Sequence, residues 1–373
     1  MTRQEKVQKR QQNSSHAIKH EARLSAFARS LLREWRKLGL PQSGARVVVA
    51  VSGGADSSTL MLALDELVQS EKLKINPIVA HLNHKLRGKA SDADSRWVRG
   101  LAKQLGHQVV TAAIDVKKRA LRSGDNLEQA ARRARYEFLT KTAKAKKAKF
   151  VVTAHTMDDQ AETVLLNLLR GTGPDGLAGI DVTRALKSGS DIVLARPLLS
   201  WATRADTESY GREHAIDFRV DETNADETRT RVRVRRQLLP LLKTFNPKFV
   251  ERLAHTIEIL REDNLALDAA ALRLLDLSSD QRQSGRNRRP TSLRADLLRF
   301  APPALRRRAL RLWLARVRGD LRRLDSAHIF AIEKLLASTS SGRLIELPGQ
   351  STVSRKDGLI HFHAAKSKGR ART

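Results

Sequence analysis

A run of small polar residues after an apolar segment is the stretch best suited to chemistry. Residues 47–51, Val-Val-Val-Ala-Val, have the composition of a strand buried on both faces. Two glycines then allow a sharp turn, and an apolar helical pattern follows at residues 60–64. Unpaired N–H groups at the start of a helix bind phosphate, aided by the helix dipole. The predicted phosphate-binding residues are Ser52, Gly53, Gly54, Ala55, Asp56, Ser57 and Ser58.

Asp56 distinguishes this turn from other phosphate loops. The turn lacks the Gly-Lys-[Ser/Thr] ending of a Walker loop and the three spaced glycines of a dinucleotide-binding loop. A carboxylate inside a phosphate-binding turn repels the ligand unless a cation lies between them. Asp56 is therefore predicted to hold Mg²⁺ at a nucleotide phosphate. The alternative is an ordinary strand-to-helix turn, in which Gly and Ser are common.

A second group of acids follows the apolar segment at residues 149–155. Asp158 and Asp159 fall in the first turn of a predicted helix, and Glu162 lies one turn later. These acids are expected at the carboxyl edge of the sheet, which favours a second Mg²⁺ or a site for an amine. The alternative is that they complement the helix dipole. His81 and His84 lack a Cys or a close carboxylate to complete a metal site, and we expect them to line the ligand crevice.

Alternating strand and helix patterns must position these groups. Strands are predicted at residues 47–51, 75–83, 108–114 and 149–155, and helices at 22–38, 91–105, 126–144 and from 157 onward. This order predicts an α/β fold with a doubly wound parallel sheet. The helix at 126–144 carries Glu128, Arg132 and Arg135 on its polar side. The glycine-dense residues 170–179 are predicted to form an irregular, mobile substrate loop.

Composition narrows the class of protein. The net charge of +30 and a pI near 11.1 predict a polyanionic partner, nucleic acid first. The absence of Cys excludes disulfides and thiolate metal sites formed by this chain. No apolar run approaches the roughly 18 residues of a membrane span. The N-terminus has no hydrophobic signal core. The sequence therefore predicts a soluble, cytoplasmic protein with no membrane partner.

Arginine is concentrated in the second half of the chain. Between residues 281 and 323 it recurs throughout, opposed within that stretch by Asp296 and Asp320. A helix predicted at 304–318 places Arg307, Arg311 and Arg318 outward, and Arg307 and Arg311 are predicted to bind RNA. Such one-sided charge predicts contacts to phosphates with steep salt dependence. At 4% aromatic residues, base stacking is the less obvious mode.

These patterns predict four regions. Residues 1–20 form a flexible basic arm, and residues 21–243 form the α/β domain that carries the phosphate turn. Residues 244–340 form a helical, arginine-rich region for a nucleic acid, with a long helix at 250–277. Residues 341–373 form a small β element and a disordered tail, since alternating segments at 342–362 are separated by turns at Pro348-Gly349 and Lys356-Asp357-Gly358.

The motifs, taken in order, resemble those of the tRNA-isoleucine lysidine synthetases, which belong to the PP-loop superfamily of N-type ATP pyrophosphatases. The resemblance covers roughly residues 46–242. Besides the phosphate turn, it rests on residues 81–87, 126–128, 131–136, 154–163, 170–179, 196–198, 221–226 and 231–241. Two departures are visible: Val232 stands where the family usually has Asn, and the usual aromatic near Arg229 is missing.

The resemblance implies a ligase that uses ATP and Mg²⁺. In that family ATP adenylates the C2 oxygen of the wobble cytidine in an isoleucine tRNA with a CAU anticodon. The ε-amino group of free lysine then attacks C2 and expels AMP. The resemblance makes Asp56, Asp158, Asp159, Glu162, Arg132 and Arg135 catalytic candidates, and His84, Arg87, His155, Arg170, Arg231 and Arg235 candidates for substrate or RNA contact.

Two alternatives stay open beside this interpretation. One is another tRNA-modifying enzyme on the same core, of the cytidine thiolase type; the absence of Cys argues against it. The other is a non-catalytic RNA-binding module, for which decay of the loop or of the carboxylates would be expected. The sequence leaves open which group is the general base, how the anticodon is recognised, and whether the chain forms a homodimer.

Overall fold

The structure is a computed structural model that describes residues 24–187, 189–216, 218, 230–279, 291–321, 323–338 and 343–364. The chain divides into two compact units, Met1–Ile257 and Glu258–Thr373, and each is described by itself. The predicted arm at 1–20, the tail at 366–373 and the motif at 221–226 lie outside the described residues. Among the helices of the described ranges, none is long and apolar enough to cross a bilayer.

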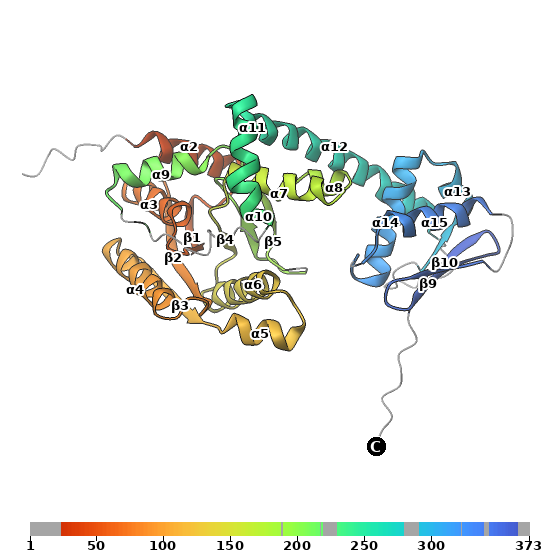
Figure 1. Ribbon diagram of the computed structural model, residues 1–373, viewed down its shortest axis with the longest axis horizontal. Helices are drawn as coiled ribbons and strands as arrows, with labels where there is room; N and C mark the ends of the chain where they lie inside the picture. The colour runs from red at the N-terminus through yellow and green to blue at the C-terminus, as the bar shows by residue number, and fades with distance from the viewer. Residues whose placement is uncertain are drawn as a thin grey trace, which may run out of the picture. The chain divides into compact units, whose positions relative to one another are not determined.

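The first unit is built on a six-stranded sheet in the order β3-β2-β1-β4-β6-β5 (Figure 1). Its strands are β1 (Ser43–Ala50), β2 (Lys74–Asn83), β3 (Gln108–Ala113), β4 (Phe150–Val152), β5 (Thr183–Ala185) and β6 (Val193–Ala195). All neighbouring pairs are parallel except β5 with β6. The predicted doubly wound sheet is confirmed. β5 and β6 were not predicted, because three residues are too few to show a period.

Helices cover both faces of this sheet. The helices of the first unit are α2 (Ala26–Lys37), α3 (Ala55–Gln69), α4 (Lys89–Gln104), α5 (Val116–Ser123), α6 (Leu127–Ala145), α7 (Met157–Leu169), α8 (Pro174–Leu177), α9 (Arg204–Glu213), α10 (Thr230–Arg233), the π-helix η2 (Val234–Leu238) and α11 (Leu239–Phe245). Val47 and Val49 pack with α2 and α3, whereas Val48 packs with Phe138 of α6 on the other face. The alternation of β1 therefore serves two cores, as a doubly covered strand requires.

The glycine-dense segment is more ordered than predicted. It contains α8, whose Gly176 carbonyl accepts a hydrogen bond from Asn167 Nδ2 at 2.8 Å. Ile180 N donates to Gln160 Oε1 at 2.6 Å. A Cβ built on Gly179 would lie 2.6 Å from that same Gln160 oxygen, so glycine permits the close approach. The prediction of an irregular segment is wrong at Pro174–Leu177, which form α8.

The second unit joins helices to a four-stranded antiparallel sheet, ordered β7-β10-β9-β8. Its elements are β7 (Ser292–Arg294), α13 (Ala295–Phe300), α14 (Pro303–Arg318), α15 (Ser326–Ala337), β8 (Leu344–Leu347), β9 (Ser351–Lys356) and β10 (Leu359–His363). α12 (Phe249–Ser278) contributes Ala271 and Leu275 to the same core as Trp313. The β element predicted at 342–362 is confirmed, and β7 adds a strand that was not predicted.

One expectation about α14 is wrong. Arg318 does not simply face outward: it is half-buried, and its guanidinium donates to the Pro348 carbonyl at 3.0 Å. Arg307 is exposed and Arg311 is half-buried. Arg308 is buried and pairs with Asp268 of α12. The arginines of this helix therefore divide between packing and surface roles.

Candidate active site

The predicted phosphate turn lies between the end of β1 and the start of α3. Gly53 has φ +97°, which an L side chain rarely adopts, so glycine is needed there. Ser57 closes the turn, because its hydroxyl accepts from Ser52 N at 3.0 Å and donates to the Gly54 carbonyl at 3.1 Å. Gly54 is the N-cap of α3 and makes no side-chain cap bond to the first helical N–H groups. Those groups are thus left for a ligand, as phosphate binding requires.

The space beside Gly54 also fits a phosphate. A Cβ built there would meet Ser52 Oγ at 3.7 Å, an ordinary contact, and the Gly54 backbone has φ −77°. Neither packing nor backbone strain therefore requires glycine at position 54. A close approach by a ligand gives glycine a reason at this position.

Asp56 lies in the first turn of α3, beside the phosphate turn at residues 52–57. Thr207 of α9 donates its hydroxyl to one carboxylate oxygen, and Arg204 Nε lies 3.7 Å from the other. Burial raises the pKa of Asp56 to about 6, against the lowering effects of Thr207 and Arg204. A cation at this carboxylate would favour its ionised form, so Asp56 fits the predicted Mg²⁺ ligand.

The three acids of α7 gather next to Asp56. Asp159 Oδ2 accepts from Thr156 N at 3.0 Å and so caps α7, which agrees with the alternative that the first-turn acids serve the helix itself. Asp158 Oδ2 accepts from the Arg204 backbone N–H at 2.8 Å. Glu162 is fully buried. Capping therefore accounts for one oxygen of Asp159, and the other oxygen, Oδ1, faces Arg204 at 3.4 Å.

Arginine side chains from two later helical segments converge on these acids. Glu162 accepts from Arg231 Nε at 2.9 Å and from Arg235 Nε at 2.6 Å. Arg204 lies 3.4 Å from both Glu162 Oε1 and Asp159 Oδ1. Burial favours the neutral form of Asp159, but Arg204, the Thr156 amide and Arg231 outweigh it and lower the pKa of that acid. The predicted substrate contacts of Arg231 and Arg235 thus lie at the same site as the predicted catalytic acids.

The cluster is close to electrically neutral. Its carboxylates are matched by as many cationic side chains: Asp56, Asp158, Asp159 and Glu162 face Arg204, Arg231, Arg235 and Lys243. Lys243 Nζ lies 3.6 Å from Asp158 Oδ1. Buried charges persist when they are paired in this way.

The structure does not favour the second Mg²⁺ predicted at Asp158, Asp159 and Glu162. These acids face guanidinium and ammonium groups, which occupy the positions a metal would need. Across the described ranges, no group of three or more His, Asp or Glu side chains could hold a metal ion. A bound amine, the other alternative, would have to displace one of the same cations. At Asp56, a Mg²⁺ ion would take one carboxylate and complete its shell with phosphate and water.

His155, Arg132 and Arg135 were also predicted to belong to the site. His155 Nδ1 hydrogen-bonds Thr153 Oγ1 at 3.0 Å, and burial lowers the pKa of His155, which keeps the ring neutral. Arg132 and Arg135 are on the exposed face of α6, as predicted, and Arg132 lies over the Tyr136 ring at 5.3 Å.

The two predicted histidines lie at the end of β2, where His81 contacts the backbone of β1's end. His81 is buried, and its Nδ1–H donates to the Val51 carbonyl at 2.9 Å, directly before the phosphate turn. This contact gives His81 a structural role in place of the predicted crevice lining. Arg87 pairs with Asp94 at 2.5 Å, and His84 is half-buried. Arg170 is exposed at the end of α7.

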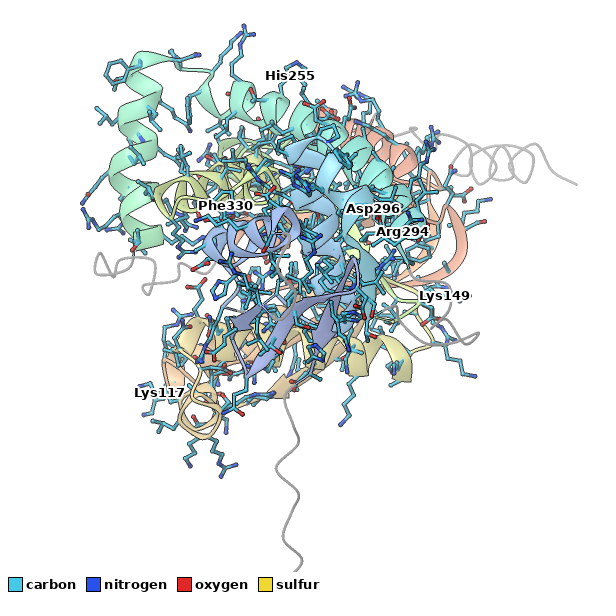
Figure 2. The ribbon with its side chains drawn as sticks, turned by 90° about the vertical axis from the view of Figure 1, so that its right-hand side faces the viewer. Lys117, Lys149, His255, Arg294, Asp296 and Phe330 are labelled. Carbon is cyan, nitrogen blue, oxygen red and sulfur yellow. The ribbon has the colours of Figure 1, made fainter. Side chains whose placement is uncertain are left out.

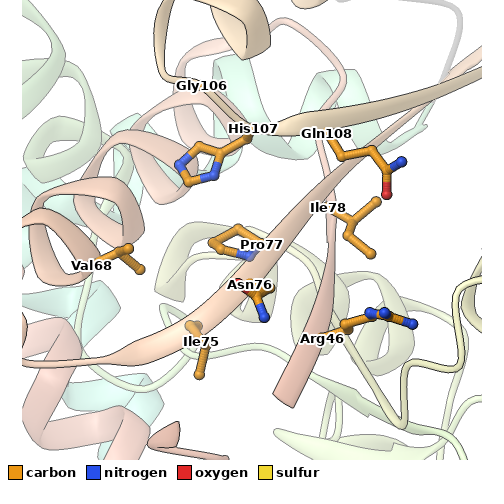
Figure 3. A pocket seen from close by; sticks show the side chains of 9 residues that line it. All are labelled: Arg46, Val68, Ile75, Asn76, Pro77, Ile78, Gly106, His107 and Gln108. Atoms are coloured by element: carbon orange, nitrogen blue, oxygen red, sulfur yellow. The ribbon is translucent and has the colours of Figure 1, made fainter. Parts of the chain in front are cut away.

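A cavity of about 250 Å³ lies elsewhere in the first unit (Figure 3). It is lined by Arg46, Val68, Ile75, Asn76, Pro77, Ile78, Gly106, His107 and Gln108. These residues include the starts of β2 and β3 and an early residue of β1. Because the strands are parallel, the cavity lies at the edge opposite the phosphate turn and does not belong to the candidate active site.

Sequence reasoning missed the residues that join the two halves of the site. Arg204 contacts Asp56, Asp159 and Glu162 with its side chain and Asp158 with its backbone N–H. Thr207, one turn later, binds Asp56 and also accepts from Thr59 Oγ1 of α3 at 2.8 Å through its carbonyl. One available signal is the Thr203-Arg204-Ala205-Asp206 capping pattern, which places Arg204 at the start of a helix.

Comparison with known proteins agrees with this geometry. Residues 21–242 match the PP-loop domain family, and residues 293–361 match the TilS substrate binding domain. The tRNA(Ile)-lysidine synthase of Geobacter sulfurreducens is 39% identical over 324 residues, which is 87% of this chain and 66% of that protein. The enzyme of the same name from Clostridioides difficile is 31% identical, over 87% of this chain and 68% of that protein. The chain thus spans about two thirds of these relatives.

A solved structure supports the fold independently. The U34-tRNA thiolase NcsA from Methanococcus maripaludis, determined with its [4Fe-4S] cluster, aligns with a TM-score of 0.50 at 17% identity, over 63% of this chain and 79% of that chain. At this identity the likeness concerns the fold alone. With the phosphate turn, the ordered motifs and the two matched domains in agreement, the chain belongs to the PP-loop ATP-binding proteins and, among them, to the tRNA(Ile)-lysidine synthase family.

Proposed function

We propose that the protein ligates free lysine to C2 of the wobble cytidine in an isoleucine tRNA with a CAU anticodon. The reaction consumes ATP and requires Mg²⁺. It passes through a cytidine adenylated on its C2 oxygen, with release of pyrophosphate. Attack by the lysine ε-amine at C2 then breaks the bond between C2 and the adenylated oxygen, and AMP leaves. A cytoplasmic location belongs to the same proposal.

The observation that carries the proposal is the bridge made by Arg204. This side chain contacts Asp56 at the phosphate turn and both Asp159 and Glu162 at the amine site. The two half-reactions use the same C2 centre, so the group that activates it and the group that supplies the amine must lie side by side. An ionic network that joins the two sites meets this requirement.

The exposed fractions of the three acidic side chains suggest different roles for them. The side chains of Asp158 and Asp159 are 10% and 14% exposed, whereas that of Glu162 is fully buried. We therefore assign Asp158 and Asp159 to hold the ammonium group of lysine and accept its proton. Glu162 acts as a positioning residue that orients Arg231 and Arg235. Arg132 and Arg135, on the exposed face of α6, are assigned to the charge that develops on the nucleotide.

The turn residues have a complementary role. The N–H groups from Gly53 to Ser57 and the Ser57 hydroxyl would hold the departing pyrophosphate. Asp56 would hold the Mg²⁺, which neutralises charge on the leaving phosphates. Thr207 and Arg204 orient the Asp56 carboxylate through contacts that are already in place. Arg307 and Arg311 belong to the second unit and are proposed to contact the RNA backbone.

A thiolase activity is the weaker alternative. NcsA shares the fold and holds an iron–sulfur cluster, whose ligands are usually Cys thiolates. This chain has no Cys. A non-catalytic RNA-binding role is also weaker, because the phosphate turn and the carboxylates are intact.

The test is incorporation of radiolabelled lysine into RNA. The full chain is incubated with MgATP, labelled lysine and an isoleucine tRNA transcript carrying CAU. We expect label in the RNA, with AMP and lysine in equal amounts. A transcript with uridine at the wobble position is the control and should stay unlabelled. ATP hydrolysis without label in the CAU transcript would contradict the ligase assignment.

A further inference from the structure

The second unit displays aromatic rings on a strongly basic surface. Its four aromatic residues are Phe300, Trp313, Phe330 and Phe362. Trp313 and Phe362 are buried in the core, where their rings meet edge to face. Phe300 is 82% exposed and Phe330 is 43% exposed. Exposed aromatic side chains in a chain with so few of them point to a role in binding.

Each exposed ring carries an arginine. The Arg307 guanidinium lies 4.7 Å from the centroid of the Phe330 ring, and the Arg299 guanidinium lies 5.8 Å from that of Phe300. Nucleic acid bases stack on aromatic rings and on the flat face of a guanidinium. A ring paired with an arginine therefore offers a base both kinds of surface, and the arginine can also reach the adjoining phosphate.

Hydrogen bonds connect the two ring–arginine pairs. Arg306 donates to the carbonyls of Arg299 and Ala301, on either side of Phe300, at 2.9 and 3.2 Å. Arg306 and Arg307 also donate to the two carboxylate oxygens of Glu333 of α15, each at 2.8 Å. The backbone beside Phe300 and the Arg307–Phe330 pair are thus linked through Arg306 and Glu333. Both rings are presented from anchored supports, which lowers the entropic cost of binding.

The charges around the rings suit a polyanion. Glu333 is 11% exposed and is neutralised by two arginines. Asp296 of α13 pairs with Arg294 at 2.7 Å, and Figure 2 shows this pair well apart from Phe330. Helices α13, α14 and α15 also carry Arg299, Arg306, Arg307, Arg311 and Lys334. This surface would repel a basic partner and attract RNA.

We propose that Phe300 and Phe330, each covered by its arginine, form a platform on which unpaired bases of the tRNA stack. The inference rests on the proposed function for its choice of tRNA as partner. It adds base stacking as a mode of recognition. From the low aromatic content alone, stacking was the less obvious mode. Stacking requires unpaired nucleotides, so the platform should distinguish tRNA from a blunt RNA duplex.

The test measures tRNA affinity of the full chain at several salt concentrations. Phe300→Ala and Phe330→Ala should each weaken tRNA binding by about fivefold or more. The salt dependence should keep its slope, because stacking releases no counterions. Phe330→Trp should bind at least as well as the native chain, whereas Arg307→Gln should lower the slope. Leu344→Ala is the matched control, since Leu344 is 52% exposed in the same unit.

Unchanged affinity in both Phe variants would overturn the inference, as would an equal loss of affinity for a blunt duplex. A change in self-association with no change in tRNA affinity would also overturn it, by showing an interface between copies. Lysine incorporation at saturating tRNA separates this outcome from failure of the proposed function. If the native chain incorporates lysine while the Phe variants bind tRNA normally, the platform alone is wrong. If no protein incorporates lysine, the ligase assignment fails and the affinities still decide the platform.

Discussion

Replacing Glu162 by glutamine should destabilise the first unit strongly. The carboxylate is fully buried and lies between 2.6 and 3.4 Å from Arg235, Arg231 and Arg204. Removing one member of a buried ion pair costs about 3–5 kcal/mol, because the remaining charges lose their partner. Glutamine keeps the volume and one acceptor oxygen, and Asp159 still contacts the same arginines. The expected loss is therefore at the lower end, about 3 kcal/mol.

Thermal unfolding provides the assay. For a unit of this size about 3 kcal/mol corresponds to a fall in Tm of about 6–12 °C. Tryptophan fluorescence reports mainly on the first unit, which contains Trp35, Trp97 and Trp201. Glu137→Gln is the matched control: Glu137 pairs with Arg119 at 2.6 Å, but its side chain is 55% exposed. An exposed pair of this kind should contribute less than about 1 kcal/mol.

Equal shifts in Tm for the two variants would refute the reasoning. That result would mean that water or Asp159 satisfies the arginines without help from Glu162. A double-mutant cycle with Arg235→Gln sharpens the test, because Arg235 makes the shortest bond to Glu162. We expect a coupling free energy above about 1 kcal/mol, as found for residues that share one network.

Four further substitutions test the phosphate turn and the contacts of Arg204. Asp56→Asn should raise the free energy of unfolding at pH 8 by up to about 3 kcal/mol, and the Tm with it. At pH 4 both should be nearly unchanged. Burial raises the pKa of Asp56 to about 6 from 3.8, so stability from the neutral form is complete below about pH 4 and is lost as the pH rises through 6; equal shifts at both pH values would contradict this. Gly54→Ala should change the free energy of unfolding by less than about 1 kcal/mol, since the added Cβ meets little protein. It should weaken MgATP binding in calorimetry, because the Cβ would occupy the space proposed for the phosphates. Gly53→Ala should instead lower the free energy of unfolding by about 1–2 kcal/mol, and the Tm with it, because φ is +97° there. A larger loss of stability for Gly54→Ala than for Gly53→Ala would count against the proposed phosphate site. Arg204→Lys should reduce kcat/KM for lysine by at least about tenfold, because an ammonium group cannot reproduce the contacts of the guanidinium fork; a native value in the incorporation assay would remove Arg204 from the site.

Local sequence was sufficient where one element carries the information. The turn at residues 52–58 has its strand, glycines and hydroxyls in consecutive positions, so its geometry could be predicted. The acids of α7 were predicted for the same reason, since Asp158, Asp159 and Glu162 follow a strand on one helix. Spacing along a single strand or helix determines which side chains share a face.

Long-range pairing is the part that local sequence could not supply. Glu162 is bonded by Arg231 and Arg235, about 70 residues later, and the segment between them includes α8, β5, β6 and α9. The second Mg²⁺ was predicted because the acids were visible and their cationic partners were not. The same reason explains Arg318, whose acceptor is a backbone carbonyl at Pro348.

Charge runs also mislead when their partners lie outside the run. The arginines at 281–323 have few acids within that stretch, yet Arg306 and Arg307 share Glu333, and Arg308 pairs with Asp268. Each of these acids lies beyond the run in sequence and beside it in the fold. Within the described part of this run, the unpaired charge is therefore smaller than the composition implies.

The most direct measurement is a crystal structure with Mg²⁺ and a non-hydrolysable ATP analogue. The central claim is that the turn from Ser52 to Ser57 receives the phosphates that leave, with Asp56 at the metal. We predict density for the β- and γ-phosphates at the amides of this turn, and a Mg²⁺ ion in contact with Asp56. A triphosphate bound elsewhere, with the turn closed by side chains, would contradict the claim.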